Sequence, residues 1–240
     1  PAGGLAACRA QWRAPGGAET VPWNSDDESV VCEVYMEKVW LQSYPAGVPA
    51  TIDADAYRSL GEVFQLSVQR YADKPAFICM GGQLSFRELG DEAAHFAAYL
   101  QNDLKLPRGA RVALMMPNIL QYPVAMFGAL LGGYTVVNVN PLYTARELEH
   151  QLRDSGAEAI VIVENFAAVL QKVLPAVKLR QVIVTKLGDL LPAPRRQLVN
   201  FVVRHVKKMV PAWEIAGAQD FRRVLECGRQ YTLQAPDVGP

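Results

Sequence analysis

The chain has 240 residues, of which 50% are hydrophobic and 20% charged; this composition is typical of a globular protein and excludes disorder throughout. Lysine plus arginine and aspartate plus glutamate each number 24, so no net field would draw the whole chain to nucleic acid or to a membrane. The 4 cysteines lie far apart without a C-x-x-C pair, which argues against zinc and against a disulfide framework and indicates a cytoplasmic protein.

The beginning of the chain differs in pattern from the rest. Residues 1–35 are rich in glycine, proline and alanine and show no sustained period of a helix or a strand. Arg9 and Arg13 interrupt the alanine-rich start, so the apolar core of a signal peptide does not form. Better patterned sequence begins at Met36. We therefore predict that residues 1–35 are a disordered or non-native extension and that residues 36–240 form the folded domain.

The patterned part opens with a helix and a hairpin. Apolar residues recur at helical spacing over 57–71, which predicts the helix. Two short apolar runs, 76–80 and 83–86, are joined by Gly81 and Gly82 and are typical of a two-stranded hairpin.

Two capping boxes predict where helices begin. Ser85 is followed three residues later by Glu88, which predicts the start of a helix that runs to Asn102. Thr144 and Glu147 repeat the same spacing further along the chain. In such a box the hydroxyl and the carboxylate each accept a hydrogen bond from a backbone N–H that the first helical turn leaves free.

The central part of the chain alternates short Val- and Ile-rich runs with helical segments. This alternation is typical of a parallel sheet whose faces are both covered by helices, because each crossover helix returns the chain to the same end of the sheet. We therefore predict an α/β fold with a doubly wound, mostly parallel sheet. The expected strands are 111–116, 134–139, 158–163 and 180–185, and the expected helices between them are 119–131, 145–155 and 166–173.

One long segment carries no charge. Between Arg111 and Arg146 the sequence is largely apolar, but three prolines and three asparagines interrupt it. A bilayer span needs about 20 continuous apolar residues. We therefore interpret the segment as a strand, a helix and a strand that are buried in the sheet.

After Lys186 the pattern loosens into a turn, a basic amphipathic helix over 195–208 and an irregular connection. The basic segment has five cations and no acid, a local charge of +5, which indicates either an anionic partner or a solvated helix face. Both alternatives stay open. The five cations are Arg195, Arg196, Arg204, Lys207 and Lys208.

No nucleotide-binding motif of the G-x-G-x-x-G or G-x-x-x-x-G-K-[ST] form occurs, and Gly128 and Gly132 are better explained by close packing and a helix end. Polar residues at expected strand ends could bond a ligand, but closing loops is the favoured role. These candidates are Asn118, Asn138, Asn140 and Tyr143. The histidines show no metal-ligand spacing and are interpreted as ordinary helix residues: His95, His150 and His205.

Two segments resemble core motifs of adenylate-forming enzymes. They are LSFREL, at 84–89, and LLGGYTVVNVNP, at 130–141. Continuous stretches such as RVALMMPNILQYPVAMFGALLGGYTVVNVNPLYTARELEHQLRDSGAEAIVIV and NFVVRHVKKMVP resemble the amino-terminal part of bacterial long-chain fatty-acid CoA ligases. The resemblance covers essentially all of 36–240. It implies the first subdomain of the large amino-terminal domain of an adenylate-forming enzyme.

The resemblance also implies a reaction. ATP and a long-chain fatty acid would form an acyl-adenylate and pyrophosphate with Mg²⁺, and CoA would then displace AMP. In the family the phosphate loop, the metal-binding acid and the catalytic lysine follow the region seen here, so we expect the chain to stop before the phosphate loop. We expect no catalytic residue and no metal ligand in this chain, no bound cofactor, and no activity from the chain alone.

The resemblance gives the basic segment two alternative roles. Its five cations could meet the 3′-phosphate of CoA, or they could attach a cytoplasmic enzyme peripherally to the anionic surface of the inner membrane. No nucleic-acid partner is expected, and a homodimer stays open. The alternative to a ligase fragment is a stand-alone, non-catalytic α/β binding or interaction module.

Overall fold

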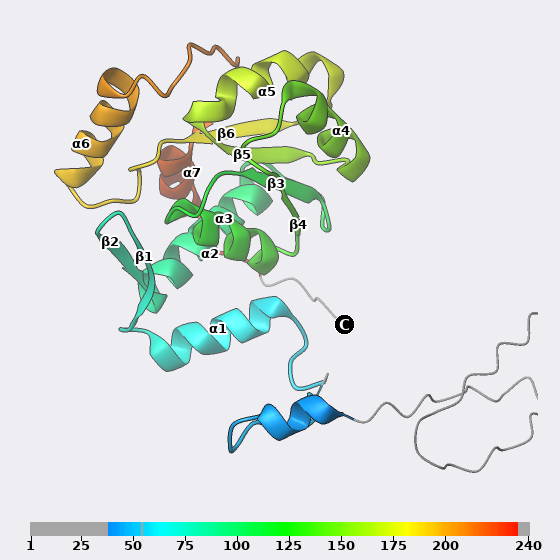
Figure 1. Ribbon diagram of the computed structural model, residues 1–240. Coiled ribbons are helices and arrows are strands. Elements are labelled where there is room, and N and C mark those ends of the chain that lie inside the picture. Colours follow the sequence, from blue (N-terminus) through cyan, green and yellow to red (C-terminus); the bar gives the residue numbers. More distant parts are fainter. Residues whose placement is uncertain (1–37, 54, 235–240) are drawn as a thin grey trace, which may run out of the picture. The chain divides into compact units, whose positions relative to one another are not determined.

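The computed structural model describes residues 38–53 and 55–234 (Figure 1). The chain divides between Ile52 and Asp53 into two compact units. Among the described residues, the first unit contains one 3₁₀ turn, η1 (Val39–Ser43), and the second contains all the other helices and strands. The extension predicted over 1–35 lies outside the described residues.

The second unit is built on a five-stranded sheet in which every neighbouring pair of strands is parallel. The spatial order is β4-β3-β5-β6-β7, so the chain crosses from β4 over β3 to reach β5. The predicted α/β fold with a parallel sheet is confirmed. The strands are β3 (Arg111–Met115), β4 (Thr135–Asn138), β5 (Ala159–Val163), β6 (Gln181–Thr185) and β7 (Gln219–Asp220).

Helices cover both faces of this sheet, and alternate strand residues pack on opposite sides. Val112 and Leu114 belong to one core cluster, whereas Ala113 and Met115 belong to the other. Every residue of β5 is buried, as expected of a strand that is covered on both faces. One face packs against α2 (Phe86–Asn102), α3 (Gln121–Leu131) and α7 (Phe221–Gly228), and the other against α4 (Ala145–Ser155) and α5 (Ala167–Val173) (Figure 1).

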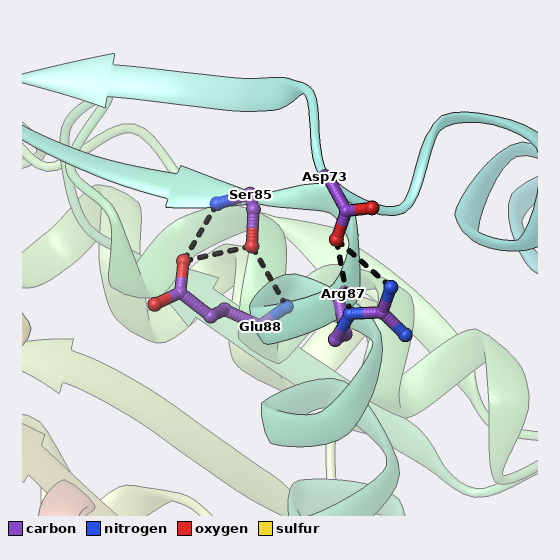
Figure 2. Close-up of polar contacts among 4 residues, drawn as sticks. All are labelled: Asp73, Ser85, Arg87 and Glu88. Carbon is purple, nitrogen blue, oxygen red and sulfur yellow. Dashed lines mark hydrogen bonds and ion pairs between the residues drawn. The ribbon is translucent and has the colours of Figure 1, made fainter.

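A two-stranded antiparallel hairpin, β1 (Pro75–Cys79) and β2 (Gly82–Ser85), leads into α2 as predicted. Figure 2 shows the capping box at the helix start. The Ser85 hydroxyl oxygen accepts a hydrogen bond from the Glu88 N–H at 3.2 Å, and Glu88 Oε2 accepts one from the Ser85 N–H at 2.8 Å. The box therefore fixes the point at which the strand ends and the helix begins.

Removing the Ser85 hydroxyl should destabilise this junction. We expect Ser85→Ala to lower the free energy of unfolding by about 1 kcal/mol, because one N–H of the first turn loses its acceptor. Urea denaturation followed by circular dichroism measures the change. Ser67→Ala is the control: the Ser67 hydroxyl donates to the Val63 carbonyl within its own helix, and its loss should change stability by less than about 0.5 kcal/mol. Equal losses in the two variants would contradict the capping role.

The helix expected over 57–71 is shorter than predicted. It forms α1 (Leu60–Tyr71), because the Ser59 hydroxyl oxygen accepts a hydrogen bond from the Glu62 N–H and so sets the start. Phe64 stacks on Phe127 of α3 with ring centroids 4.1 Å apart, which holds α1 against the α2–α3 face. Close packing at Gly128 is confirmed, since a Cβ there would lie 2.7 Å from the carbonyl oxygen of Ala93.

The prediction for the chain after Lys186 was wrong in two respects. The basic helix does not run regularly over 195–208: α6 (Arg195–Phe201) gives way to a wider π-helical turn, η4 (Val202–Val206), and neither buries a residue. The expected irregular connection, which ends at Phe221, contains the strand β7, and α7 begins at its last residue. A strand of two residues leaves no readable period, whereas α7 has a cap that the sequence analysis overlooked: Asp220 accepts hydrogen bonds from the N–H groups of Arg222 and Arg223.

No helix in the described part of the chain is both long and apolar enough to span a bilayer.

Candidate functional site

Charged side chains gather at the carboxyl ends of three neighbouring strands. Glu164 directly follows β5, Lys186 directly follows β6, and Asp220 is the last residue of β7. Open parallel sheets bind ligands at this edge, because loops rather than packed helices surround the strand ends there. The three residues define the candidate site of this chain.

A buried hydrogen-bond network supports the loop after β6. Asp189 Oδ2 accepts hydrogen bonds from the Thr185 hydroxyl at 3.0 Å and from the Lys186 N–H at 2.7 Å, and Asp189 Oδ1 accepts one from the Asn200 amide at 3.2 Å. Gln121 of α3 donates to the Lys186 carbonyl at 2.7 Å. The backbone N–H and the backbone carbonyl of Lys186 are therefore both held by hydrogen bonds.

Burial raises the pKa of Asp189 above its ordinary value. The hydrogen bonds from Lys186 and Thr185 oppose this rise, but desolvation is the larger cause. The interior therefore disfavours the charged form of the Asp189 carboxyl group, and the hydrogen bonds that this group accepts offset part of that cost.

Glu164 is the more unusual carboxyl group of the site. It is only 1% exposed, and its Oε2 atom is buried without a hydrogen-bond partner among the described residues. The nearest cation is Arg204, whose Nη1 lies 3.7 Å from Oε2, which makes an ion pair without a hydrogen bond. Burial raises the pKa of Glu164, and the positive charges of Arg204 and Lys186 offset only part of that effect.

The stability of the chain should therefore depend on the ionisation of Glu164. The folded pKa lies above the unfolded one, so the folded state loses stability as the pH rises through the folded pKa. We expect Glu164→Gln to raise the free energy of unfolding by about 1 kcal/mol at pH 8 and by less at pH 4.5, because the amide carries no charge to desolvate. Denaturation curves at both pH values test this. Glu226→Gln, on the exposed surface of α7, is the control and should behave as the parent chain; an unchanged or lower stability of Glu164→Gln at pH 8 would contradict the argument.

Two cavities open at this edge and share four lining residues, Glu164, Lys186, Arg204 and Asp220. The inner cavity, of about 390 Å³, is also lined by Val184, Trp213, Ala218 and Gln219. The outer cavity, of about 410 Å³, extends along α6. The ionisable residues that line the outer cavity are Glu164, Lys186, Asp189, Arg196, Arg204, His205, Asp220 and Arg222.

The predicted strand-end residues lie at the neighbouring strands β3 and β4 and line neither of these two cavities. Asn138 Oδ1 accepts a hydrogen bond from the Tyr122 hydroxyl at 2.9 Å, and Asn140 Oδ1 accepts one from the Leu142 N–H at 3.0 Å, so both side chains close loops. Tyr143 is half-buried against the α4–α5 core cluster. Asn118 is exposed, and its backbone carbonyl accepts from the Cys79 thiol.

The structure divides the predicted basic residues into separate groups. Arg196 and Arg204 line the outer cavity. Arg195 instead donates to the Gly81 carbonyl of the hairpin. Lys207 and Lys208 are exposed at the end of η4. The segment therefore does not act as one uniform charged face.

The sequence analysis missed Glu164, Lys186, Asp189, Asp220 and Trp213 as site residues. For Glu164 and Lys186 a signal was present, since each directly follows an expected strand, the same position that singled out the asparagines. For Asp220 and Trp213 no local pattern exists, because their places depend on a two-residue strand and on an irregular segment.

The residues that the structure describes include no group of three or more His, Cys, Asp or Glu side chains close enough to hold a metal ion. Three carboxylates lie near these strand ends without forming such a group: Glu164, Asp189 and Asp220.

Comparison with known proteins gives a consistent result. The sequence pattern of a family described as "AMP-binding enzyme" matches residues 64–220. The chain is 58% identical over 203 residues to a long-chain-fatty-acid–CoA ligase of Yersinia pestis and 54% identical over 205 residues to one of Escherichia coli O157:H7. Each match covers 85% of this chain but only 36% of the relative. The resemblance drawn from the sequence is confirmed, and the chain spans about a third of the length of these relatives.

The fold comparison agrees. A crystal structure of a long-chain-fatty-acid-CoA ligase from Archaeoglobus fulgidus superposes with a TM-score of 0.57 at 18% identity, covering 81% of this chain and 34% of the other. At that identity the likeness concerns the fold alone.

Proposed function

Because the chain belongs to the AMP-binding enzyme family, we propose that it is part of a long-chain fatty-acid CoA ligase. The observation that carries the proposal is the identity of 58% and 54% to two bacterial ligases of that name over 85% of this chain. Identity at this level over a continuous stretch supports a shared reaction as well as a shared fold.

The proposed reaction has two steps. A carboxylate oxygen of the fatty acid attacks the α-phosphorus of ATP, forms a mixed anhydride with AMP and releases pyrophosphate. The thiolate of CoA then attacks the acyl carbon, forms the thioester and releases AMP. The first step is needed because a carboxylate is a poor electrophile, and both steps gather phosphate charge that cations and N–H groups must neutralise.

This chain would contribute to binding rather than to the chemical step. Lys186, Arg196 and Arg204 bring positive charge to the carboxyl edge of the sheet, where phosphate groups could be held. Mg²⁺ would neutralise phosphate charge when bound, but the described residues offer it no ligand group, so we assign no step through the metal to this chain. We accordingly propose that the 240-residue chain alone forms no acyl-CoA.

The test is an assay of acyl-CoA formation from oleate, ATP and CoA, separated by reversed-phase chromatography. A longer natural protein that contains this sequence should form oleoyl-CoA and AMP in equal amounts, and omission of ATP or CoA should abolish the product. The 240-residue chain serves as the matched comparison. If the longer protein binds oleate whether or not a nucleotide is present and forms no oleoyl-CoA, the proposal is wrong. That result would favour the non-catalytic module.

The basic segment combines two proposed roles. Arg196 and Arg204, in the outer cavity, would meet a phosphate of CoA. Lys207 and Lys208 stand beside exposed apolar side chains and would attach the protein peripherally to an anionic membrane. The exposed apolar side chains of this segment are Leu198, Phe201, Val206 and Met209.

Paired charge reversals separate the two roles. In the longer protein, Arg196→Glu with Arg204→Glu should raise the KM for CoA and leave liposome binding unchanged. Lys207→Glu with Lys208→Glu should abolish co-sedimentation with vesicles that contain phosphatidylglycerol and leave the kinetics unchanged in solution. If both double variants alter the same property, the division of the segment is wrong.

A further inference from the structure

A cavity of about 610 Å³ opens at the amino ends of β5 and β6, at the opposite edge of the sheet from the candidate site. Its lining comes from three places: the end of α4, the residues directly before β5, and the segment from the end of η3 (Leu174–Ala176) to β6. The volume lies in the range of small-molecule sites, about 300 to 1,000 Å³. The cavity is therefore large enough to hold a small molecule.

The bottom of this cavity is apolar. Leu152 and Ala157 line it, are only 2% and 5% exposed, and belong to the α4–α5 core cluster. Val177 also lines it and packs half-buried against the same cluster. Water at such a wall finds few hydrogen-bond partners, so an aliphatic group that displaces it gains apolar contact.

The rim of the cavity is positively charged. Arg153, Lys178 and Arg180 are exposed there, and the lining contains one carboxylate, Glu158, so its net charge is +2. Glu158 is already paired, since its Oε2 lies 2.9 Å from Nε of Arg180. The Lys178 ammonium forms no salt bridge with the described residues. The rim therefore attracts anions.

Local structure accounts for only one of these cations. Arg153 lies in the last turn of α4, where a cation offsets the negative end of the helix dipole, and it pairs with Glu149 at 3.1 Å. Lys178 belongs to a different segment and has neither role. Arg111, at the start of β3, adds a further cation beside the cavity: its Nη1 lies 3.6 Å from the position of a Cβ on Gly156. Positive charge thus remains for a ligand.

The apolar bottom and the cationic rim together select the chemistry of an occupant. A small inorganic anion would form only exposed ion pairs, which solvent screens, and would leave the bottom of the cavity unused. A cationic amphiphile would be repelled by the rim. A molecule that joins an aliphatic chain to an anionic headgroup satisfies both parts of the lining. Guanidinium groups pair with carboxylate and with phosphate alike, so either headgroup fits.

We propose that this cavity binds a single-chain amphiphile with an anionic headgroup. The aliphatic part lies on Leu152, Ala157 and Val177, and the headgroup lies beside Lys178 and Arg180. Free fatty acids and single-chain phospholipids share this chemistry and differ in the headgroup. The inference goes beyond the proposed function, because the lining of this cavity alone carries it.

Nuclear magnetic resonance titration of the isotope-labelled 240-residue chain tests the inference. The probes are decanoate, decyl phosphate, acetate and decyltrimethylammonium, each kept below the concentration at which it forms micelles. We expect one of the two anionic amphiphiles to bind about tenfold or more tightly than acetate and than the cationic amphiphile. The amide signals of residues 152–158 and 176–180 should move most. Tighter binding of decanoate would identify a carboxylate headgroup, and tighter binding of decyl phosphate would identify a phosphate headgroup.

Variants assign the binding to this cavity. Lys178→Glu should weaken binding of the preferred probe about tenfold, because it places a negative charge at the rim. Ala176→Trp, at an exposed position of the lining, should block the cavity and abolish binding. Lys172→Glu, exposed on α5 and outside the lining, is the matched control and should leave the affinity unchanged. Circular dichroism melting of every variant verifies that it is folded.

A second control separates this cavity from the basic segment, which also combines cations with exposed apolar side chains. Lys207→Glu with Lys208→Glu removes positive charge from that segment and should leave binding at the cavity unchanged. If the probes move the signals of residues 198–209 and not those of the cavity, the inference is wrong.

Three other results would overturn the inference: neither anionic amphiphile binds to the folded chain, acetate or the cationic amphiphile binds as tightly as they do, or the folded Lys178→Glu and Ala176→Trp variants bind as the parent does. These failures are distinct from a failure of the proposed function, because formation of oleoyl-CoA by the longer protein is measured independently. That activity without binding at the cavity would keep the ligase proposal and reject the inference.

Discussion

Replacing Gly228 by alanine is expected to lower the free energy of unfolding by about 3 kcal/mol and to detach α7 from the sheet. Gly228 ends α7 directly against α2, and a Cβ at this position would overlap the backbone carbonyl of His95. A backbone atom within a helix cannot turn aside as a flexible side chain can. The helices would have to separate, which would open the contact between Phe96 and Phe221, whose ring centroids lie 5.6 Å apart.

A glycine elsewhere in the chain supplies the control. Gly61 lies in the first turn of α1, where the nearest atom to a new Cβ, the Ser59 hydroxyl oxygen, would be 3.5 Å away. Gly61→Ala should therefore keep or raise stability by up to about 1 kcal/mol, because alanine favours the helix. Urea denaturation followed by far-UV circular dichroism measures both variants. A Gly228→Ala chain with the midpoint of the parent would show that α2 and α7 are not in close contact.

Replacing Asp189 by alanine is expected to cost about 3 kcal/mol of stability. The change removes the acceptor of three hydrogen bonds at once, which come from the buried Thr185 hydroxyl and from the half-buried Lys186 N–H and Asn200 amide. The loop after β6 would then lose the contacts that fix Lys186. Asp189→Asn keeps the size of the side chain and one good acceptor, so we expect it to cost less than half as much.

Denaturation curves at pH 7 compare these variants with Asp91→Ala, an exposed position on α2 that should change stability by less than about 0.5 kcal/mol. The order of stability should be parent, Asp189→Asn, Asp189→Ala. If Asp189→Ala were as stable as the parent chain, the network would contribute nothing, and the cost of burying the carboxylate would equal its gain from hydrogen bonding.

The inner strands β3, β5 and β6 could be predicted from the sequence because nearly all of their residues are buried. A segment such as 159–163, AIVIV, has no polar side that could tolerate water, so a position between other strands with helices on both sides is the arrangement that buries it fully. The starts of α2 and α4 were equally readable, since each capping box is a local contact within four residues.

The site was harder to predict from the sequence because its residues are far apart along the chain but close together in the structure. Glu164 and Arg204 are far apart in the sequence, and no local pattern around either residue predicts that the two form an ion pair. Trp213 lies in a segment without period, and it reaches the cavity only because β7 pairs with β6 through two residues, Gln219 and Asp220. Cooperative packing of the whole sheet, rather than local preference, brings these residues together.

The strand order has a consequence for synthesis on the ribosome. β3 is the first strand of the five-stranded sheet to be made, yet it lies between β4 and β5, and β5 emerges only after two helices and another strand. Until then one edge of the nascent β3–β4 pair presents free N–H and carbonyl groups that any extended chain could join. The interior place of the earliest strand thus makes the half-made chain a natural client for a chaperone, whereas the finished sheet has β3 enclosed on both sides.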